Sequence, residues 1–211
     1  LSPKPTSYQL YLQQDNPAAL QNYNDKKAKI RGHKLYWHKP ATWQKDPQSD
    51  RKEYEPLMQP VKNGITFQCR IRFQNLSSVE LGALLTAINL PDGCAHKIGM
   101  GKAYGLGSVQ LKAQLCLSDR TARYASFGAE LLSPPPAADT KSFTKSFADF
   151  VVAASAAENA ASTPGLWDTP RMKELRRMLT FKTGISPEKI SYMELPEFKD
   201  KKVLPKPTDV K

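Results

Sequence analysis

Four glycines and two lysines gather in one stretch of the chain, HKIGMGKAYGLGSVQL, residues 96–111. The lysines are Lys97 and Lys102, and the glycines are Gly99, Gly101, Gly105 and Gly107. The whole chain has only 11 glycines in 211 residues, so more than a third of them fall in this stretch. Glycine lets the backbone turn left-handed and expose neighbouring amide N–H groups, because it has no Cβ. Such amides beside two ammonium groups suit the oxygens of a phosphodiester.

Two other kinds of glycine-rich site do not fit this stretch. A dinucleotide site needs a strand before the glycines and a helix after them, which is the reverse of the order expected here. A phosphate loop of the Walker type needs Gly-Lys followed by Ser or Thr, and the chain has none. Two interpretations stay open: a hairpin whose glycines serve only close packing, and a loop that grips an RNA backbone.

A strand and a helix are expected before the glycines. The run ITFQCRIRFQ, residues 65–74, alternates with period two, which predicts a half-buried strand with a basic outer face. Its inward residues would be Phe67, Cys69, Ile71 and Phe73, and its outward residues Gln68, Arg70, Arg72 and Gln74. Ser77 with Glu80 forms a capping-box pattern that begins a helix. The apolar stripe of that helix would be Leu81, Leu84, Leu85 and Ile88, and PDG at 91–93 ends it.

A second alternating run follows the glycines. In SVQLKAQLCL, residues 108–117, the apolar members Val109, Leu111, Ala113, Leu115 and Leu117 would face inward, and Gln110, Lys112 and Gln114 outward. The predicted order is therefore strand, helix, glycine loop, strand. Arg70, Arg72, Gln110 and Lys112 would share the open face of the sheet beside the loop.

The remainder of the chain is less regular. Residues 27–39 interleave basic and aromatic side chains, including Arg31, His33 and Tyr36, and predict an extended basic segment; residues 40–60 predict a loop. Residues 119–139 predict a linker. Helices are expected over 140–161, with Phe143, Phe147, Phe150 and Val151 on one side, and from Thr169-Pro170 to a C-cap at Gly184. A basic extended tail should end the chain.

Composition narrows the class of protein. The chain holds 31 Lys and Arg against 20 Asp and Glu, a net charge of +11, which favours an anionic partner. No window is apolar enough for a membrane span, and no signal-peptide pattern is present, so we expect no membrane partner. Cys69, Cys94 and Cys116 have no paired spacing, which predicts reduced thiols in a cytoplasmic protein, with Cys69 in the core.

At these residues the sequence resembles a known family. The runs RIRFQNLSSVELGALLTAI and HKIGMGKAYGLGSVQL are similar to the RAMP superfamily of CRISPR-associated proteins, whose glycine-rich loop has the form GxGxxxGxG and follows the second helix. The opening PKPTSYQLYL and RGHKLYWH look like the type III branch: type III-D, or the single-chain type III-E (giant RAMP) effectors. The resemblance is loose over residues 1–117 and close over residues 61–117.

The resemblance implies an α+β, ferredoxin-like (RRM-type) fold, of which only the second half, strand-helix-glycine loop-strand, is visible. We expect the C-terminal RAMP module of a longer effector: residues 1–118 with a core at 61–118, a linker at 119–139, and a helical extension with a basic tail at 140–211. The implied function is to hold crRNA or target RNA inside a complex that cleaves target RNA. The RNA-binding set would be Arg31, His33, Arg70, Arg72, His96, Lys97, Gly99, Met100, Gly101, Lys102, Tyr104, Gly105 and Gly107.

The resemblance also implies partners: crRNA, target RNA, the remaining RAMP modules and a caspase-like peptidase subunit. No cofactor is expected in this segment. A zinc site is compatible only with other parts of a longer protein. The main alternative is a metal-independent endoribonuclease that processes precursor crRNA, with a base among the three histidines His33, His38 and His96. His33 with His38 is a weak metal pattern, and Tyr36, Trp37 and Trp43 could stack on bases or cap a core. The acids form no catalytic pair, so no catalytic residue is assigned.

Overall fold

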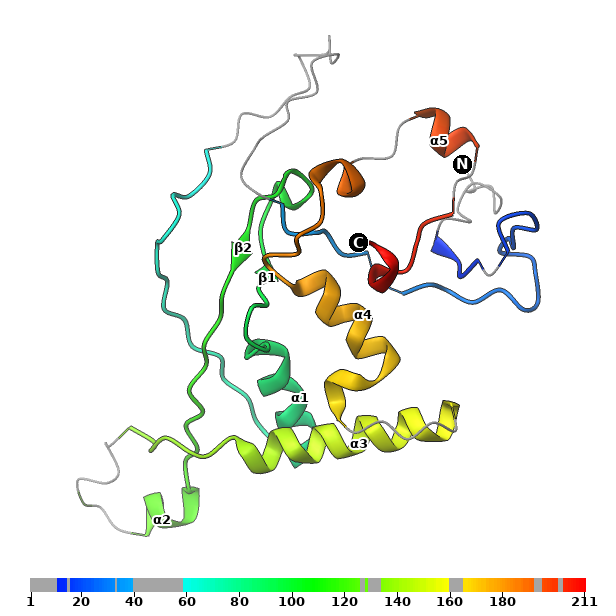
Figure 1. Ribbon diagram of the computed structural model, residues 1–211. Helices are drawn as coiled ribbons and strands as arrows, with labels where there is room; N and C mark the ends of the chain where they lie inside the picture. The colour runs from blue at the N-terminus through cyan, green and yellow to red at the C-terminus, as the bar shows by residue number, and fades with distance from the viewer. Residues whose placement is uncertain are drawn as a thin grey trace.

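The computed structural model describes residues 11–14, 16–32, 34–39, 59–125, 128, 134–159, 165–191, 195–200 and 203–211. Its helices are α1 (Ser78–Ile88), α2 (Arg120–Tyr124), α3 (Lys141–Asn159), α4 (Pro170–Leu179) and α5 (Leu195–Lys199), and its strands are β1 (His96–Lys97) and β2 (Ser108–Val109). Short 3₁₀ turns cover Lys102–Tyr104, Leu166–Asp168, Pro187–Ile190 and Pro207–Asp209. In Figure 1 the α1, α3 and α4 helices lie beside one another, and the β1–β2 hairpin rises from the end of α1.

The start of α1 follows directly from the sequence. The Ser77 side chain accepts a hydrogen bond from the Glu80 backbone N–H (3.3 Å), and the Glu80 carboxylate accepts one from the Ser77 backbone N–H (2.8 Å). The Ser77 hydroxyl also donates to the Glu80 carboxylate (2.7 Å), and the two hydrogen bonds that this carboxylate accepts, the one from the Ser77 backbone first, lower the pKa of Glu80. The predicted capping box is therefore confirmed, and with it the helix that leads into the glycine stretch.

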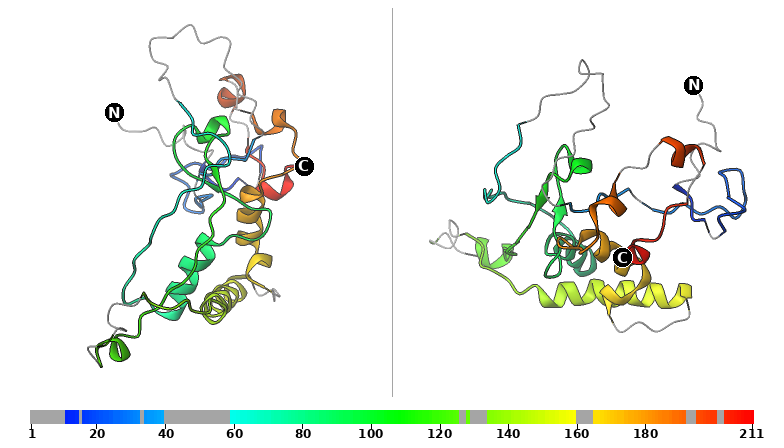
Figure 2. Two further views of the ribbon diagram at one scale, coloured as in Figure 1. Left: turned by 90° about the vertical axis from the view of Figure 1, so that its left-hand side faces the viewer. Right: turned by 45° about the horizontal axis from the view of Figure 1, so that its top comes forward.

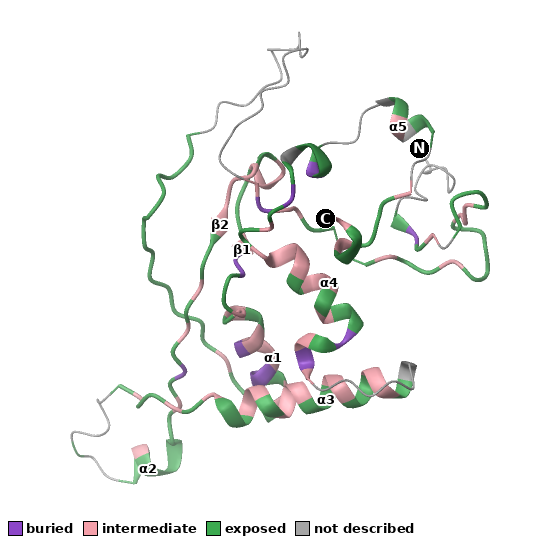
Figure 3. Ribbon diagram, viewed as in Figure 1, coloured by how far each residue is buried: buried purple, intermediate pink, exposed green. Residues whose placement is uncertain are grey.

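A small core holds α1 to the chain that follows the hairpin. Leu81, Leu85 and Leu115 are buried together. The residues packed around them are Phe73, Leu117, Ala138 and Phe143. Figure 3 shows how few of the described residues are buried to this degree. The core therefore depends on the contact of α1 with the 111–117 segment and with α3.

Helices α1 and α3 cross at Gly82, which is buried. A Cβ built on Gly82 would stand 2.0 Å from the Phe143 carbonyl oxygen and 2.9 Å from the Phe147 Cβ. The backbones of the two helices can approach this closely only because residue 82 has no side chain. The two views of Figure 2 both show α1 resting on α3.

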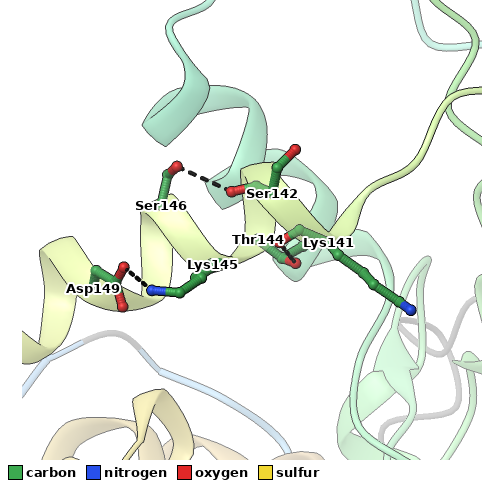
Figure 4. A network of polar contacts seen from close by, with 6 residues as sticks. All are labelled: Lys141, Ser142, Thr144, Lys145, Ser146 and Asp149. Carbon is green, nitrogen blue, oxygen red and sulfur yellow. Dashed lines mark hydrogen bonds and ion pairs between the residues drawn. The ribbon is translucent and has the colours of Figure 1, made fainter.

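The first turns of α3 carry a set of local polar contacts (Figure 4). Ser146 Oγ donates to the Ser142 carbonyl (3.0 Å), and Thr144 Oγ donates to the carbonyls of Thr140 and Lys141. Lys145 and Asp149 form an exposed i,i+4 ion pair at 2.5 Å, which at a surface position stabilises a helix by only about 0.3–0.5 kcal/mol. All of these contacts lie within α3 and its first turn, so they do not fix where the helix lies. Its position depends mainly on packing against α1.

The alternation predicted after the hairpin is confirmed from Leu111 onward. Leu115 is buried and Leu111, Ala113 and Leu117 are half-buried, whereas Gln110, Lys112 and Gln114 are exposed. Val109 is exposed, contrary to the prediction. The ladder itself is short, since β2 ends at Val109 and the segment then continues extended to an isolated bridge between Cys116 and Ala137.

The half-buried strand predicted at 65–74 is wrong as stated. The segment is assigned no strand, and within the described chain its backbone makes no hydrogen bond to another segment. Phe67 is 77% exposed and Ile71 55% exposed, Cys69 is exposed and therefore not core, and only Phe73 packs on the α1 core. The physical reason is that no described segment covers its apolar side. In Figure 1 it runs separately along the outside of the molecule.

The C-terminal half departs from prediction in three places. The expected linker at 119–139 contains α2. Helix α4 begins at Pro170 as predicted but ends at Leu179, so Gly184 (φ +68°) lies in the following loop and does not cap it. Phe150 is exposed, unlike Phe143 and Phe147 on the same helix.

The three cysteines are free, as expected. No helix in the described parts has the length and apolar character needed to cross a membrane.

Candidate nucleic-acid interface

The glycine stretch forms a hairpin between β1 and β2. His96 pairs with Val109 and Lys97 with Ser108, and the Ile98 N–H donates to the Gly107 carbonyl at 2.8 Å. All four glycines have positive φ: +88° at Gly99, +69° at Gly101, +98° at Gly105 and +71° at Gly107. The predicted left-handed turns are therefore confirmed. At Gly107 a Cβ would stand 1.9 Å from the Ile98 carbonyl oxygen, so this position needs both the left-handed backbone and the space.

The tip of the hairpin presents unused backbone donors. The carbonyl of Gly101 accepts from the N–H groups of Tyr104 (3.0 Å) and Leu106 (3.2 Å), which closes the turn. The N–H groups of Gly99, Met100 and Gly101 have no acceptor in the part of the chain that is described. Met100 lies between two left-handed glycines and is 74% exposed. Successive amides in such an alternating conformation form a concave group of donors that suits an anion.

Both lysines of the stretch direct their ammonium groups onto the loop. Lys97 Nζ donates to the carbonyls of Gly105 (2.9 Å) and Leu106 (3.0 Å), and Lys102 Nζ donates to the carbonyl of Gly99 (2.5 Å). Burial, and next the charge of Lys39, lower the pKa of Lys97 to about 8. The two ammonium groups therefore hold the loop together through hydrogen bonds to its own carbonyls. Within the described chain no carboxylate forms an ion pair with Lys97.

His96 connects the hairpin to the preceding helix. Its Nε2–H donates to the Ile88 carbonyl at 3.0 Å, which satisfies one of the free carbonyls at the end of α1. One ring nitrogen is therefore engaged in positioning the hairpin. This contact gives no support to His96 as the general base of a ribonuclease.

His38 lies under the hairpin and is only 2% exposed. Its Nε2–H donates to the Ala95 carbonyl (3.0 Å), its Nδ1 accepts from the Ser108 hydroxyl (2.8 Å), and its ring meets Phe181 edge-on at 5.6 Å. Burial is the main cause that lowers the pKa of His38, so the ring is neutral near pH 7. Because both ring nitrogens are occupied, His38 is available neither as a metal ligand nor as a base.

The end of α4 forms the other support of the hairpin. The Ala95 N–H donates to the Leu179 carbonyl and the Phe181 N–H to the Gly93 carbonyl, both at 2.8 Å, around a bridge between Cys94 and Thr180. Segments near residues 38, 95 and 180 therefore meet at the base of the hairpin. The sequence patterns did not predict that these three segments meet. The interleaved KLYWHK run indicates an extended segment, but it does not indicate which segment that one contacts.

The structure brings nine of the predicted site residues together and separates three of them, Arg31, Arg70 and Arg72, from the hairpin. His96, Lys97, Gly99, Met100, Gly101, Lys102, Tyr104, Gly105 and Gly107 all lie in the one hairpin. Arg70 and Arg72 are exposed on the 65–74 segment and make no hydrogen bond or ion pair with the described hairpin. His33 lies outside the described residues, as does Trp43.

Arg31 is also separated from the hairpin. Its guanidinium donates to the carbonyls of Leu204 (2.6 Å) and Pro205. Burial lowers the pKa of Arg31, and the charge of Glu174 opposes that shift. Arg31 therefore binds the segment at 204–205. The basic tail, which was predicted only to be extended, is held against the rest of the molecule there and at Val210, whose carbonyl accepts from Arg177 (2.8 Å).

No protein-family model and no curated protein matches this chain. Within the described ranges no group of three or more His, Cys, Asp or Glu side chains is placed to hold a metal ion.

Proposed function

We propose that the chain is an RNA-binding structural module of a type III CRISPR effector, of the RAMP kind, which holds the backbone of crRNA or target RNA with its glycine hairpin. The observation that carries the proposal is the run of three amide N–H groups at Gly99, Met100 and Gly101, which have no acceptor in the described chain and share one loop with the ammonium groups of Lys97 and Lys102. A phosphodiester supplies the acceptor oxygens and the negative charge that such a group lacks.

The chemistry of the hairpin favours single-stranded RNA held in a sequence-tolerant manner. Its donors are main-chain and ammonium groups, which contact phosphates and read no base edge. Tyr104 is 53% exposed in the same turn, where its ring can lie against a base or a ribose. The net charge of +11 adds a long-range attraction for a polyanion.

The exposed 65–74 segment supports the further expectation that other RAMP modules, in the same or another chain, complete the sheet. Its backbone has no hydrogen-bond partner among the described residues, and Phe67 and Ile71 are exposed, as on an edge strand to which another strand can add. In this proposal Arg70 and Arg72 reach the RNA only in the completed effector. The peptidase partner stays an expectation from the resemblance.

Binding of a fluorescent single-stranded RNA to the full chain tests the proposal. The double variant Lys97→Gln/Lys102→Gln is expected to bind at least about tenfold more weakly at low salt, because two charged phosphate contacts are lost. The slope of log affinity against log salt should fall by about 1.4, since each contact with a single strand contributes about 0.7. Far-ultraviolet circular dichroism confirms that the variant is folded.

The matched control is Lys141→Gln/Lys173→Gln, which removes the same charge from exposed positions on α3 and α4. It should bind almost as the unchanged chain does. Equal losses in the two double variants would mean that only net charge matters, and the proposed site would then be rejected.

A further inference from the structure

Lys39 belongs to a segment far from the hairpin in sequence that is held at the base of the hairpin. The preceding residue, His38, is hydrogen-bonded to the carbonyl of Ala95, just before β1, and to the hydroxyl of Ser108, in β2. Ser108 is the cross-strand partner of Lys97, so the His38 contact brings the neighbouring Lys39 toward Lys97, and the charge of Lys39 is one cause that lowers the pKa of Lys97. Both lysines are half-buried. Neighbouring positive charges of this kind attract an anion.

We infer that Lys39 and Lys97 together bind a phosphate of the nucleic acid, so that the strand continues from the glycine loop onto the 34–39 segment. The inference rests on the proposed function and adds to it a second contact, from a residue that the glycine pattern does not include. Lys97 is suited to bind a phosphate together with Lys39. Its Nζ donates two hydrogen bonds, to the carbonyls of Gly105 and Leu106, and has a third N–H donor for the phosphate. A phosphate there would also relieve the repulsion between the two lysines.

This arrangement gives RNA binding a defined pH dependence. Burial and Lys39 hold the pKa of Lys97 at about 8, so the free protein begins to lose this charge as the pH rises through 8. A bound phosphate raises that pKa, and binding then takes up a proton above pH 8, so affinity must fall as the pH rises. The other groups around Lys97 are its two carbonyl partners, the neutral His38 ring and the neighbouring His96; no described carboxylate opposes the effect.

The test compares the full chain with Lys39→Gln over pH 7–9.5, using single-stranded RNA at constant salt. Lys39→Gln is expected to lower the affinity by about tenfold at pH 7, through loss of a charged phosphate contact. It should also move the decline in affinity to higher pH, because Lys97 no longer faces a second ammonium. A mutant that was merely destabilised would not show this second effect.

The control is Lys34→Gln, in the same segment but with its ammonium over the Tyr36 ring at 5.1 Å. It should leave both the affinity at pH 7 and the pH of the decline nearly unchanged. If Lys39→Gln behaves like Lys34→Gln while Lys97→Gln/Lys102→Gln still weakens binding, the inference is overturned and the proposed function stands. If the unchanged chain binds no RNA, the proposed function itself has failed.

Discussion

Replacing Gly107 with alanine is expected to disrupt the hairpin and lower the free energy of unfolding by about 3 kcal/mol or more. Two costs combine at this position. An L-residue with a side chain at φ +71° incurs roughly 1–2 kcal/mol of left-handed strain. The added Cβ also stands 1.9 Å from the Ile98 carbonyl oxygen, a backbone atom that can move only if the hairpin opens, and such overpacking costs about 1–3 kcal/mol. Denaturant unfolding of the full chain measures the loss.

Gly99→Ala is the matched control for Gly107→Ala. Gly99 is left-handed as well, at φ +88°, but a Cβ there meets nothing within 4 Å. This variant should lose only the conformational part, about 1–2 kcal/mol. Equal effects of the two substitutions would show that Gly107 does not lie against Ile98 in solution, and the hairpin geometry would then be incorrect.

The second large effect is expected at Gly82, where helix propensity and packing predict opposite signs. Replacing a glycine inside a helix with alanine ordinarily stabilises by about 0.5–1 kcal/mol. Here the new Cβ would be 2.0 Å from the Phe143 carbonyl oxygen, so α1 and α3 must separate. We expect the clash to prevail and Gly82→Ala to destabilise the protein by roughly 2–3 kcal/mol, with the loss measured by the same unfolding experiment.

Ala87→Gly provides the comparison on the exposed side of the same helix. It should cost about 1 kcal/mol from propensity alone. If the Gly82→Ala variant is more stable than the unchanged protein, α1 and α3 do not cross closely at residue 82. A segment other than α3 would then have to pack over Leu81 and Leu85.

Local signals allowed correct prediction of several individual elements. The capping box at Ser77 and Glu80, the start of α4 at Pro170 and the alternation from Leu111 to Leu117 depend on neighbours within a few residues, and the structure confirms each. The glycine pattern likewise predicted left-handed turns, because a positive φ is a property of single residues. These features need no information about distant segments.

Predictions that depended on distant contacts succeeded less well. The alternation at 65–74 is typical of a half-buried strand, but burial needs a covering segment, and no described segment supplies one for Phe67 or Ile71. Arg31 was grouped with the RNA-binding residues because it lies in the interleaved basic and aromatic segment that resembles the type III family. Its guanidinium instead donates to the carbonyls of residues 204 and 205, more than 170 residues away. His38 and Lys39 reach the hairpin through contacts that no sequence period records.

Amide resonances of the ¹⁵N-labelled full chain, followed during titration with single-stranded RNA, test the central claim most directly. If the main chain of the hairpin holds phosphate oxygens, the amide signals of Gly99, Met100 and Gly101 shift as RNA is added and their hydrogen exchange slows. RNA that binds while these three amides keep both their shifts and their exchange rates would contradict the account.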